Sequence, residues 1–270
     1  MIFNIKGGLG NQLFQYAFAR QFSERPILDL SWFKNQGDAT AREFQLEKYF
    51  DLPYLVCPIS LAKIVRRVNR TSFSEKKEYS YDNDAFNMVN IYYSGYWQSI
   101  RYLNGISSDA FHFKYTALSD EIVKYENTIK ESKVSISLHI RRGDYLSNVD
   151  ANTTHGLLSL DYYYNALKYL KEKWSCEKLD IFVFSDDPVW VLNEFELSEF
   201  GNINVVSETN ELDDLYLMSL TKANIIANST FSWWGAYLNK NKNKIVIAPN
   251  NWLADGRDCS ELFFDDWVVI

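Results

Sequence analysis

The stretch Ser137-Leu-His-Ile-Arg-Arg-Gly-Asp-Tyr145 lies near the middle of the chain and decides its fold. It continues an alternating apolar run over residues 134–140, which predicts a half-buried strand that stops at Gly143. Side chains alternate in direction along a strand, so two adjacent arginines at its end cannot both point inward. At least one guanidinium group should therefore face the region beyond the carboxyl end of the strand, where open α/β sheets bind ligands.

Two neighbouring arginines at such a position predict an anion site. The guanidinium group keeps its charge at physiological pH and offers a planar fork of donors that suits phosphate. We therefore expect Arg141 and Arg142 to bind an anion, in particular a diphosphate. The alternative is that they form surface ion pairs with Asp144 or Asp150, since charged side chains usually stay solvated.

The composition limits the class of protein. A chain of 270 residues with 47% hydrophobic residues can form one large domain or two smaller ones with full cores. The 28 basic and 35 acidic residues give a net charge of −7, which disfavours broad binding to nucleic acid or to an anionic membrane. Three scattered cysteines without CxxC spacing predict neither a disulfide framework nor a zinc site, and they suit a reducing compartment.

The beginning of the chain has the pattern of a strand over residues 2–6. No charged-then-apolar leader precedes it, and no apolar run approaches the length of a membrane span. We therefore expect a cytoplasmic protein without an integral membrane segment.

A glycine turn, Gly7-Gly-Leu-Gly-Asn-Gln12, follows this first strand and leads into a helical pattern, so that backbone amides can face a ligand. With Asp29 downstream it partly imitates a dinucleotide fingerprint, although the third glycine is missing. An NAD-dependent oxidoreductase is therefore one alternative function. Aromatic residues make up 16% of the chain and suit sugar rings as well as cores, so a carbohydrate-binding protein without catalysis is another.

Strands and helices alternate in the second half, which predicts a parallel, doubly wound sheet. The first half has a weaker pattern that indicates the same alternation of strands and helices. We expect an α/β protein with two Rossmann-like halves, residues 1–132 and 133–270, and a hinge near residues 115–133. The strand patterns lie at 134–140, 180–184, 203–206, 223–227 and 244–248, and the helical patterns lie at 160–174, 188–197, 211–220 and from 228 onward.

Every turn from a strand to a helix should lie at one edge of such a sheet. Ser229, Thr230 and Ser232 stand at a helix start, where hydroxyl groups and amides bind phosphate or cap the helix. Asp186 and Asp187 can accept hydrogen bonds from a guanine or a ribose, or cap the helix that begins at Pro188. Taken together, the turns predict a nucleotide-diphosphate site. They cover residues 7–12, 139–144, 185–187 and 228–233.

The ordered motifs of this chain resemble those of bacterial α-1,2-fucosyltransferases of glycosyltransferase family 11. They are Gly-Gly-Leu-Gly-Asn-Gln, His-x-Arg-Arg-x-Asp, Phe-Ser-Asp-Asp and Asn-Ser-Thr-Phe-Ser-Trp-Trp, and they span residues 7–234. The resemblance implies a GT-B architecture with a cleft between an acceptor-side lobe and a nucleotide-sugar-binding lobe. It also implies inverting transfer of L-fucose from GDP-β-L-fucose to the 2-hydroxyl of a terminal galactose on an oligosaccharide or surface polysaccharide, without a metal or other cofactor.

The resemblance also implies roles for single residues. Arg141 would hold the β-phosphate, and Arg142 would assist it near the phosphates or the fucose. His139 and Asp187 would lie by the guanine or its ribose, and Asp186 would belong to the same substrate-binding set. The remaining substrate-binding set would be Gly8, Gly10, Asn11 and Gln12 over the donor, with Asn228, Ser229, Thr230, Phe231 and Ser232 at the pyrophosphate. The acceptor side is not part of these motifs, and Tyr92, Tyr93, Trp97 and Trp32 are its candidates.

The mechanism follows from the charges involved. Breaking the bond between fucose C1 and GDP develops negative charge on the β-phosphate and an oxocarbenium-like sugar. Fixed positive charges and amides stabilise this transition state, as a metal does in other glycosyltransferases. Asp144 is the candidate general base for the acceptor hydroxyl. It could instead hold Arg142 or cap a turn, and a dissociative route would need no strong base.

Overall fold

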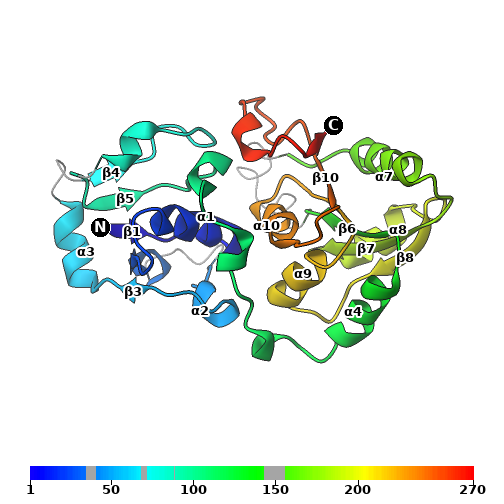
Figure 1. Ribbon diagram of the computed structural model, residues 1–270, viewed down its shortest axis with the longest axis horizontal. Coiled ribbons are helices and arrows are strands. Elements are labelled where there is room, and N and C mark those ends of the chain that lie inside the picture. Colours follow the sequence, from blue (N-terminus) through cyan, green and yellow to red (C-terminus); the bar gives the residue numbers. More distant parts are fainter. Residues whose placement is uncertain (35–40, 68–71, 88, 143–155) are drawn as a thin grey trace. The chain divides into compact units, whose positions relative to one another are not determined.

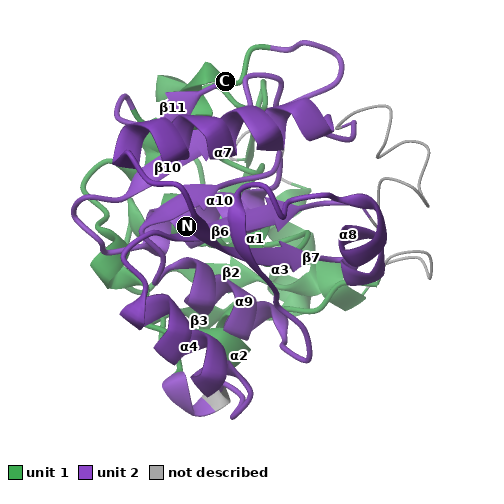
Figure 2. Cartoon of the chain, turned by 90° about the vertical axis from the view of Figure 1, so that its right-hand side faces the viewer, with its two compact units in different colours: residues 1–114, 258–264 green, residues 115–257, 265–270 purple. Residues whose placement is uncertain are grey.

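The computed structural model describes residues 1–34, 41–67, 72–87, 89–142 and 156–270. The chain forms two compact units, coloured green and purple in Figure 2. Unit 1 consists of Met1–Lys114 and Asp258–Phe264, and unit 2 of Tyr115–Arg257 and Asp265–Ile270. Each unit is an α/β structure with its own parallel sheet (Figure 1), which confirms the predicted fold class.

The sheet of unit 1 has the strand order β3-β2-β1-β5-β4, and its strands pair in parallel. The order reverses between β1 and β5, because the chain passes from β1 to β2 and β3 on one side and returns through β4 on the other. The strands are β1 (Ile2–Asn4), β2 (Ile27–Asp29), β3 (Leu55–Val56), β4 (Ser72–Ser74) and β5 (Tyr92–Ser94). The helices are α1 (Leu9–Arg20), α2 (Leu46–Tyr49) and α3 (Ile59–Arg66), with 3-10 turns η1 (Ser31–Lys34), η4 (Asn83–Phe86), η5 (Ile100–Leu103), η6 (Ser108–Ala110) and η8 (Ser260–Leu262).

Aromatic side chains form much of the core of unit 1. The rings of Phe18 and Trp97 stack with centroids 3.9 Å apart, and those of Phe3 and Tyr93 stack at 5.1 Å. All four residues are buried. The large aromatic content of this half therefore serves packing, since each such ring removes a large apolar surface from water.

The sheet of unit 2 has the order β11-β10-β9-β6-β7-β8, again with parallel pairing. Its strand order reverses between β6 and β9. The strands are β6 (Ser135–Ile140), β7 (Leu179–Ser185), β8 (Gly201–Val205), β9 (Ala223–Ile225), β10 (Ile245–Ala248) and β11 (Val268–Val269). The helices are α4 (Ile122–Glu131), α7 (Leu160–Trp174), α8 (Pro188–Glu194), α9 (Glu211–Met218) and α10 (Thr230–Leu238), with the 3-10 turn η7 (Tyr115–Ala117).

The central strand β6 differs from the prediction of a half-buried strand. All six of its residues are buried, because helices cover both faces of a parallel sheet of this kind. The polar positions are satisfied inside the core. Ser137 Oγ, for example, accepts a hydrogen bond of 2.6 Å from Asn224 Nδ2 on the neighbouring strand β9.

Two segments link parts of the chain that lie far apart in sequence. Residues 115–132, which the sequence assigned to the first domain, pack within unit 2, where Tyr216 Oη donates to Glu126 at 2.7 Å. Residues 258–264 return to unit 1, where Glu261 accepts hydrogen bonds from the backbone N–H of Tyr81 at 2.6 Å and from Ser99 Oγ at 2.8 Å.

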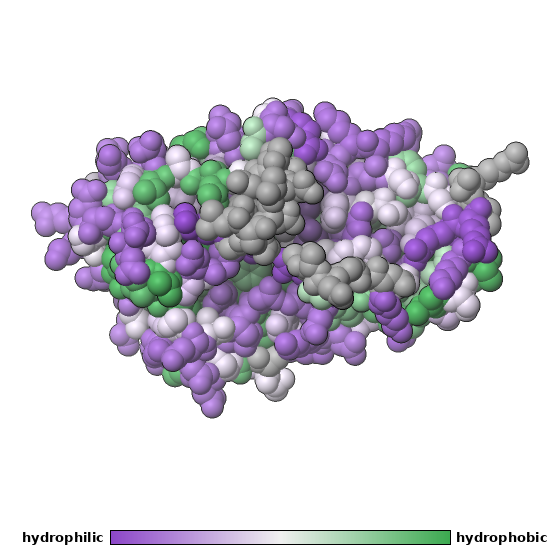
Figure 3. Space-filling model, turned by 180° about the vertical axis from the view of Figure 1, so that it is seen from behind, coloured by the Kyte–Doolittle hydropathy of each residue, from purple (hydrophilic) through white to green (hydrophobic). Residues whose placement is uncertain are grey.

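The surface mixes polar and apolar side chains. On the face shown in Figure 3, hydrophobic residues form small patches among hydrophilic ones. In the described parts of the chain we find no helix with both the length and the apolar character that crossing a membrane requires.

Candidate functional site

Three of the four predicted turns lie together at the carboxyl edge of the unit 2 sheet. They follow β6, β7 and β9, and β6 is hydrogen-bonded to both of the other strands. The first of these turns begins with Arg141, the second contains Asp186, and the third contains Ser229. The strand order reverses between β6 and β9, and ligands of open α/β sheets bind at such a point.

The two aspartates after β7 contact the two arginines after β6. Arg141 Nε lies 3.3 Å from Asp186 Oδ2, and Arg142 Nε lies 3.6 Å from Asp187 Oδ2. The backbone N–H of Arg142 also donates to Asp186 Oδ1 at 2.8 Å. Each arginine thus has a carboxylate on the Nε side of its guanidinium group, which restricts the direction in which the group points.

Asp187 and Trp190 complete the surroundings of Arg142. Asp187 is the N-cap of α8, and its Oδ1 accepts from the backbone N–H of Trp190 at 3.1 Å, with Pro188 in the first helical turn. This confirms the capping that the sequence suggested. The guanidinium carbon of Arg142 lies 3.7 Å from the centre of the Trp190 ring, a cation–π contact.

Both arginines form ion pairs, and their partners in the structure are Asp186 and Asp187. Asp144 and Asp150, the partners considered from the sequence, lie outside the described residues. The proposed general base Asp144 is one of them, so the structure assigns it no position.

His139 is a buried residue of β6, two positions before Arg141. It is 5% exposed, and its ring centroid lies 5.7 Å from that of Phe231 on α10, which links the β6 and β9 turns. Burial lowers the pKa of His139 to about 3, and the positive charge of Arg141 acts in the same direction. The imidazole is therefore neutral. Its Nδ1 atom is buried and has no hydrogen-bond partner among the described residues.

The start of α10 supplies hydroxyl and amide groups at this edge. Ser229 is the N-cap, and its Oγ accepts from the N–H of Phe231 at 3.3 Å, while Ser232 Oγ donates to Ser229 O at 3.3 Å. Thr230 is the first helical residue and is partly exposed. Asn228 is buried and donates to the carbonyl oxygen of Gly156 at 3.1 Å, so at least part of its amide holds the loop.

The glycine turn belongs to unit 1, where it joins β1 to α1. Gly7 has a φ of +80°, a left-handed conformation that glycine adopts without strain. A Cβ atom at Gly8 would meet no heavy atom within 4 Å, so the backbone there is open to approach. Gly10 is buried in the first turn of α1, and Asn11 Oδ1 accepts from Gln98 Nε2 at 2.8 Å.

Gln12 has a structural role in this turn. Its Nε2 donates to the carbonyl oxygens of Gly7 at 2.9 Å and Glu43 at 2.8 Å, and its Oε1 accepts from the N–H of Gln45 at 2.9 Å. The side chain is fully buried. The amide therefore ties the glycine turn to the segment before α2, and both of its donor hydrogens are used by backbone.

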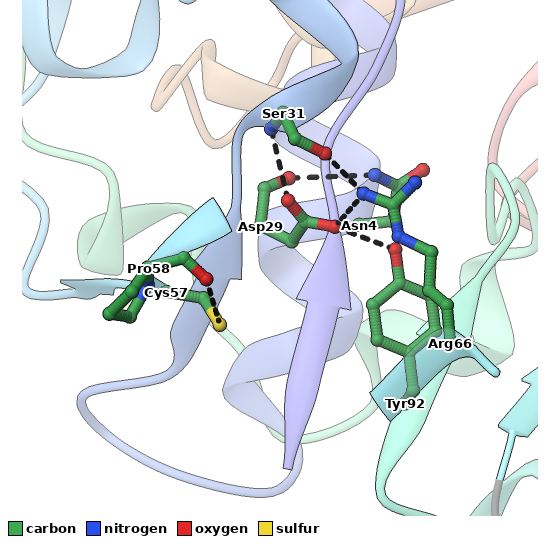
Figure 4. Close-up of polar contacts among 7 residues, drawn as sticks. All are labelled: Asn4, Asp29, Ser31, Cys57, Pro58, Arg66 and Tyr92. Carbon is green, nitrogen blue, oxygen red and sulfur yellow. Dashed lines mark hydrogen bonds and ion pairs between the residues drawn. The ribbon is translucent and has the colours of Figure 1, made fainter. Parts of the chain in front are cut away.

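Asp29, the acid of the imitated dinucleotide fingerprint, is not available to a ribose. Its buried carboxylate accepts from Arg66 Nη2 and Tyr92 Oη, at 2.6 and 2.7 Å, and from the N–H of Ser31 at 3.0 Å (Figure 4). Burial acts to raise the pKa of Asp29, but these hydrogen bonds and the charge of Arg66 outweigh it and lower the pKa. The arrangement anchors α3 and argues against the NAD alternative.

Most of the acceptor-side candidates from the sequence lie in the core. Tyr92, Tyr93 and Trp97 are all buried in the core of unit 1. Sequence reasoning also missed Trp190, although its position one turn beyond the capping Asp187 could have placed it next to the arginine strand. Across the described ranges, no group of three or more His, Cys, Asp or Glu side chains is arranged to hold a metal ion.

Solved fucosyltransferases resemble this chain at low sequence identity. Fucosyltransferase NodZ from Bradyrhizobium aligns with a TM-score of 0.48 and 14% identity, over 88% of this chain and 91% of its own. POFUT1 in complex with GDP aligns with a TM-score of 0.46 and 10% identity, over 91% and 97%.

Sequence comparison gives nearer relatives. The O-antigen biosynthesis glycosyltransferase WbnK of Escherichia coli is 34% identical over 98% of both chains. An alpha-1,2-colitosyltransferase of Escherichia coli is 33% identical over 93% of this chain and 92% of its own. A galactoside 2-alpha-L-fucosyltransferase of Caenorhabditis elegans is 24% identical over 89% and 69%. Residues 69–270 match glycosyl transferase family 11, and the chain belongs to that family of glycosyltransferases.

Proposed function

We propose that this glycosyltransferase moves L-fucose from GDP-β-L-fucose to the 2-hydroxyl of a terminal galactose, on an oligosaccharide or a surface polysaccharide. The names of two relatives support the linkage, since one is an alpha-1,2-colitosyltransferase and the other a galactoside 2-alpha-L-fucosyltransferase. The second name also supports fucose as the donor sugar and a galactoside as the acceptor.

One observation carries the proposal for the donor. Arg141 and Arg142 lie at the point of unit 2 where the strand order reverses, and Asp186 and Asp187 contact both on their Nε sides. Arginines held in this way form a pre-arranged cationic site for a diphosphate, with little side-chain freedom to lose on binding. The start of α10, capped by Ser229, adds backbone N–H groups and a favourable helix dipole for the same anion.

The assigned roles follow from these contacts. Arg141 holds the β-phosphate, Arg142 assists it, and residues 229–232 bind the pyrophosphate from the α10 side. Asp186 and Asp187 orient the arginines, because their carboxylate oxygens are directed to the guanidinium groups and to backbone N–H groups. The neutral His139 offers its buried Nδ1 for a hydrogen bond to the nucleotide, which would satisfy an otherwise unpaired polar atom.

The chemical step uses this positive charge directly. Cleavage of the bond between fucose C1 and the β-phosphate oxygen leaves the electron pair on GDP, whose added negative charge the arginines stabilise more than the ground state. The acceptor hydroxyl forms the new bond from the opposite face of the sugar and passes its proton to a base, for which Asp144 is the candidate, so the anomeric configuration inverts. In this proposal the two guanidinium groups take the place of a divalent metal.

A single assay tests the proposal. The purified chain is incubated with GDP-β-L-fucose and a panel of β-galactosides in EDTA, and the product linkage and anomeric configuration are determined by NMR. We expect an α-1,2-linked fucosyl galactoside, formed at an undiminished rate in EDTA. Loss of activity in EDTA would contradict metal independence, and a retained β configuration would contradict inversion.

Two further reactions examine the donor. GDP-colitose replaces GDP-fucose in the first, because a colitosyltransferase is among the relatives. GDP-mannose is added as a competitor in the second, and we expect it to compete poorly. Preferred turnover of the colitosyl donor would replace fucose in the proposal and leave the diphosphate site unchanged. Calorimetry with GDP alone distinguishes a transferase that uses a GDP-sugar donor from a carbohydrate-binding protein without catalysis. We expect the transferase to bind GDP and the carbohydrate-binding protein not to bind it.

A further inference from the structure

The carboxyl edge of the unit 1 sheet carries a polar cluster next to the glycine turn. It lies around the point where the strand order reverses, between β1 and β5, with β4 next to β5. Open parallel sheets bind ligands beyond the carboxyl ends of their strands at this point. Glu75 directly follows β4, Tyr96 comes two residues after β5, and Lys6 comes two residues after β1.

The three side chains are held together by short contacts. Glu75 Oε2 accepts from the backbone N–H of Tyr96 at 2.6 Å, and Oε1 accepts from the N–H of Trp97 at 3.0 Å. Lys6 Nζ lies 4.2 Å from the centre of the Tyr96 ring. Glu75, Tyr96 and Lys6 are all partly exposed, whereas the neighbouring Trp97 is buried in the aromatic core.

The backbone is shaped around the Glu75 carboxylate. Trp97 has a φ of +59°, a left-handed conformation that is uncommon for a bulky side chain. A Cβ atom at position 95 would lie 2.5 Å from Glu75 Cβ and 2.9 Å from its Oε2, so only glycine fits there. The turn after β5 therefore wraps closely around this carboxylate and fixes its position, and unusual backbone of this kind gathers at binding sites.

Keeping a carboxylate at this place is unfavourable by itself. Burial raises the pKa of Glu75 to about 7, although the two backbone hydrogen bonds and the charge of Lys6 act in the opposite direction. No ion pair of Glu75 occurs among the residues that the structure describes, and perturbed carboxyl groups of this kind concentrate at functional sites.

We infer that Glu75, Tyr96 and Lys6 bind hydroxyl groups of the galactoside acceptor. This inference rests on the proposed function, which requires a neutral sugar as the second substrate. The carboxylate accepts hydrogen bonds from sugar hydroxyls, the ammonium group donates to hydroxyl or ring oxygens, and the phenol does both. A phosphate suits this cluster less well than the arginine edge of unit 2, because one ammonium group stands here beside a carboxyl group instead of two guanidinium groups. The edge of unit 1 therefore differs in chemistry from the arginine edge of unit 2.

The test uses two variants that leave the Glu75 backbone contacts in place. Tyr96→Phe removes only the phenol oxygen, and Lys6→Met removes only the ammonium group. The matched controls are Tyr81→Phe and Lys63→Met, at partly or fully exposed positions of unit 1 outside the cluster. We expect each cluster variant to raise the acceptor KM about tenfold, the effect of losing one hydrogen bond. The KM for GDP-fucose and the Kd for GDP should stay unchanged in these variants. In the two control variants the acceptor KM should stay unchanged as well.

A binding measurement without turnover separates this inference from the proposed function. Methyl β-D-galactopyranoside is titrated into each variant in the presence of GDP and followed by saturation-transfer NMR. Binding that weakens only in the cluster variants supports the inference, even if the chain transfers no fucose and the proposed function fails. An active enzyme whose acceptor KM is unaltered in both cluster variants overturns the inference alone. Absence of both galactoside binding and turnover overturns both.

Discussion

The guanidinium group of Arg142 lies over the indole ring of Trp190, with 3.7 Å between Cζ and the ring centroid. The same arginine contacts Asp187, the residue that caps the helix on which Trp190 stands. One short helix thus supplies both an aromatic face and a carboxylate to a single cation. The position of Arg142 therefore depends on α8 as much as on its own strand.

Replacing the ring should weaken donor binding. We expect Trp190→Leu to raise the Kd for GDP roughly two- to thirtyfold, because a cation–π contact contributes about 0.5–2 kcal/mol. Calorimetry with GDP measures the effect. The control is Val189→Ala on the same helix, whose side chain is 66% exposed. An unchanged Kd in Trp190→Leu would show that the ring does not hold the arginine for the ligand.

Removing the side chain of Arg141 should reduce the rate of fucosyl transfer strongly. We expect Arg141→Ala to remain folded and to lose activity by about 10² or more, the scale of losing one contact to the charge that develops in the transition state. The fucosyl transfer rate at saturating substrates measures this loss. Arg67→Ala, an exposed arginine of unit 1, is the matched control. Near-normal turnover of the Arg141 variant would contradict its assignment to the β-phosphate.

The buried His139 makes a prediction about pH. An unfolded chain protonates this imidazole near pH 6.5, whereas the folded pKa is about 3. The unfolded state therefore binds more protons between these values, so stability from this residue is present above pH 6.5 and is lost as the pH falls. When the pH falls from 7.5 to 5, the free energy of unfolding of the unaltered chain should therefore decrease by about 2 kcal/mol more than that of the His139→Gln variant. Urea titrations measure the difference, and an imidazole that titrates near 6.5 by NMR would contradict it.

The buried Asp29 should contribute to the stability of unit 1. We expect Asp29→Ala to reduce the free energy of unfolding by about 1.5–3 kcal/mol, as for hydrogen bonds to a charged group. The side chain of Arg66 is 41% exposed, which keeps the loss below that of a fully buried pair. Because the pKa of Asp29 is lowered, its contribution persists above pH 4 and fades in more acidic solution. Asp51→Ala, at an exposed carboxylate, should change little by comparison.

Much of unit 2 could be predicted because its signals are local. Ser159 caps α7 by accepting from the N–H of Tyr162, and Asp187 caps α8 ahead of Pro188, both as expected. The Rossmann-like alternation also placed the arginine, aspartate and serine turns at one edge. Unit 1 was harder, because β3 has two residues and α2 has four, too few for any periodicity to appear.

The side-chain roles that the sequence did not predict depend on contacts between residues that are distant in the chain. Arg142 and Asp186 are 44 positions apart, and nothing in either motif indicates that the aspartate accepts a hydrogen bond from the backbone of the arginine. Tyr93 and Trp97 have a side-chain chemistry that suits either a sugar or a core, and only the fold assigns them to the core. Gln12 likewise lies in a binding motif yet satisfies backbone groups up to 33 positions away.

The return of residues 258–264 to unit 1 affects the order in which the protein can mature during translation. The hydroxyl of Ser99 and the N–H of Tyr81 donate hydrogen bonds to Glu261. These bonds cannot form until Glu261 has left the ribosome, which happens only after every strand through β10 has been made. The amino-terminal half is therefore made first but is completed only near the end of synthesis, when residues 258–264 emerge. During that interval it is the part of a nascent chain that chaperones and proteases would meet.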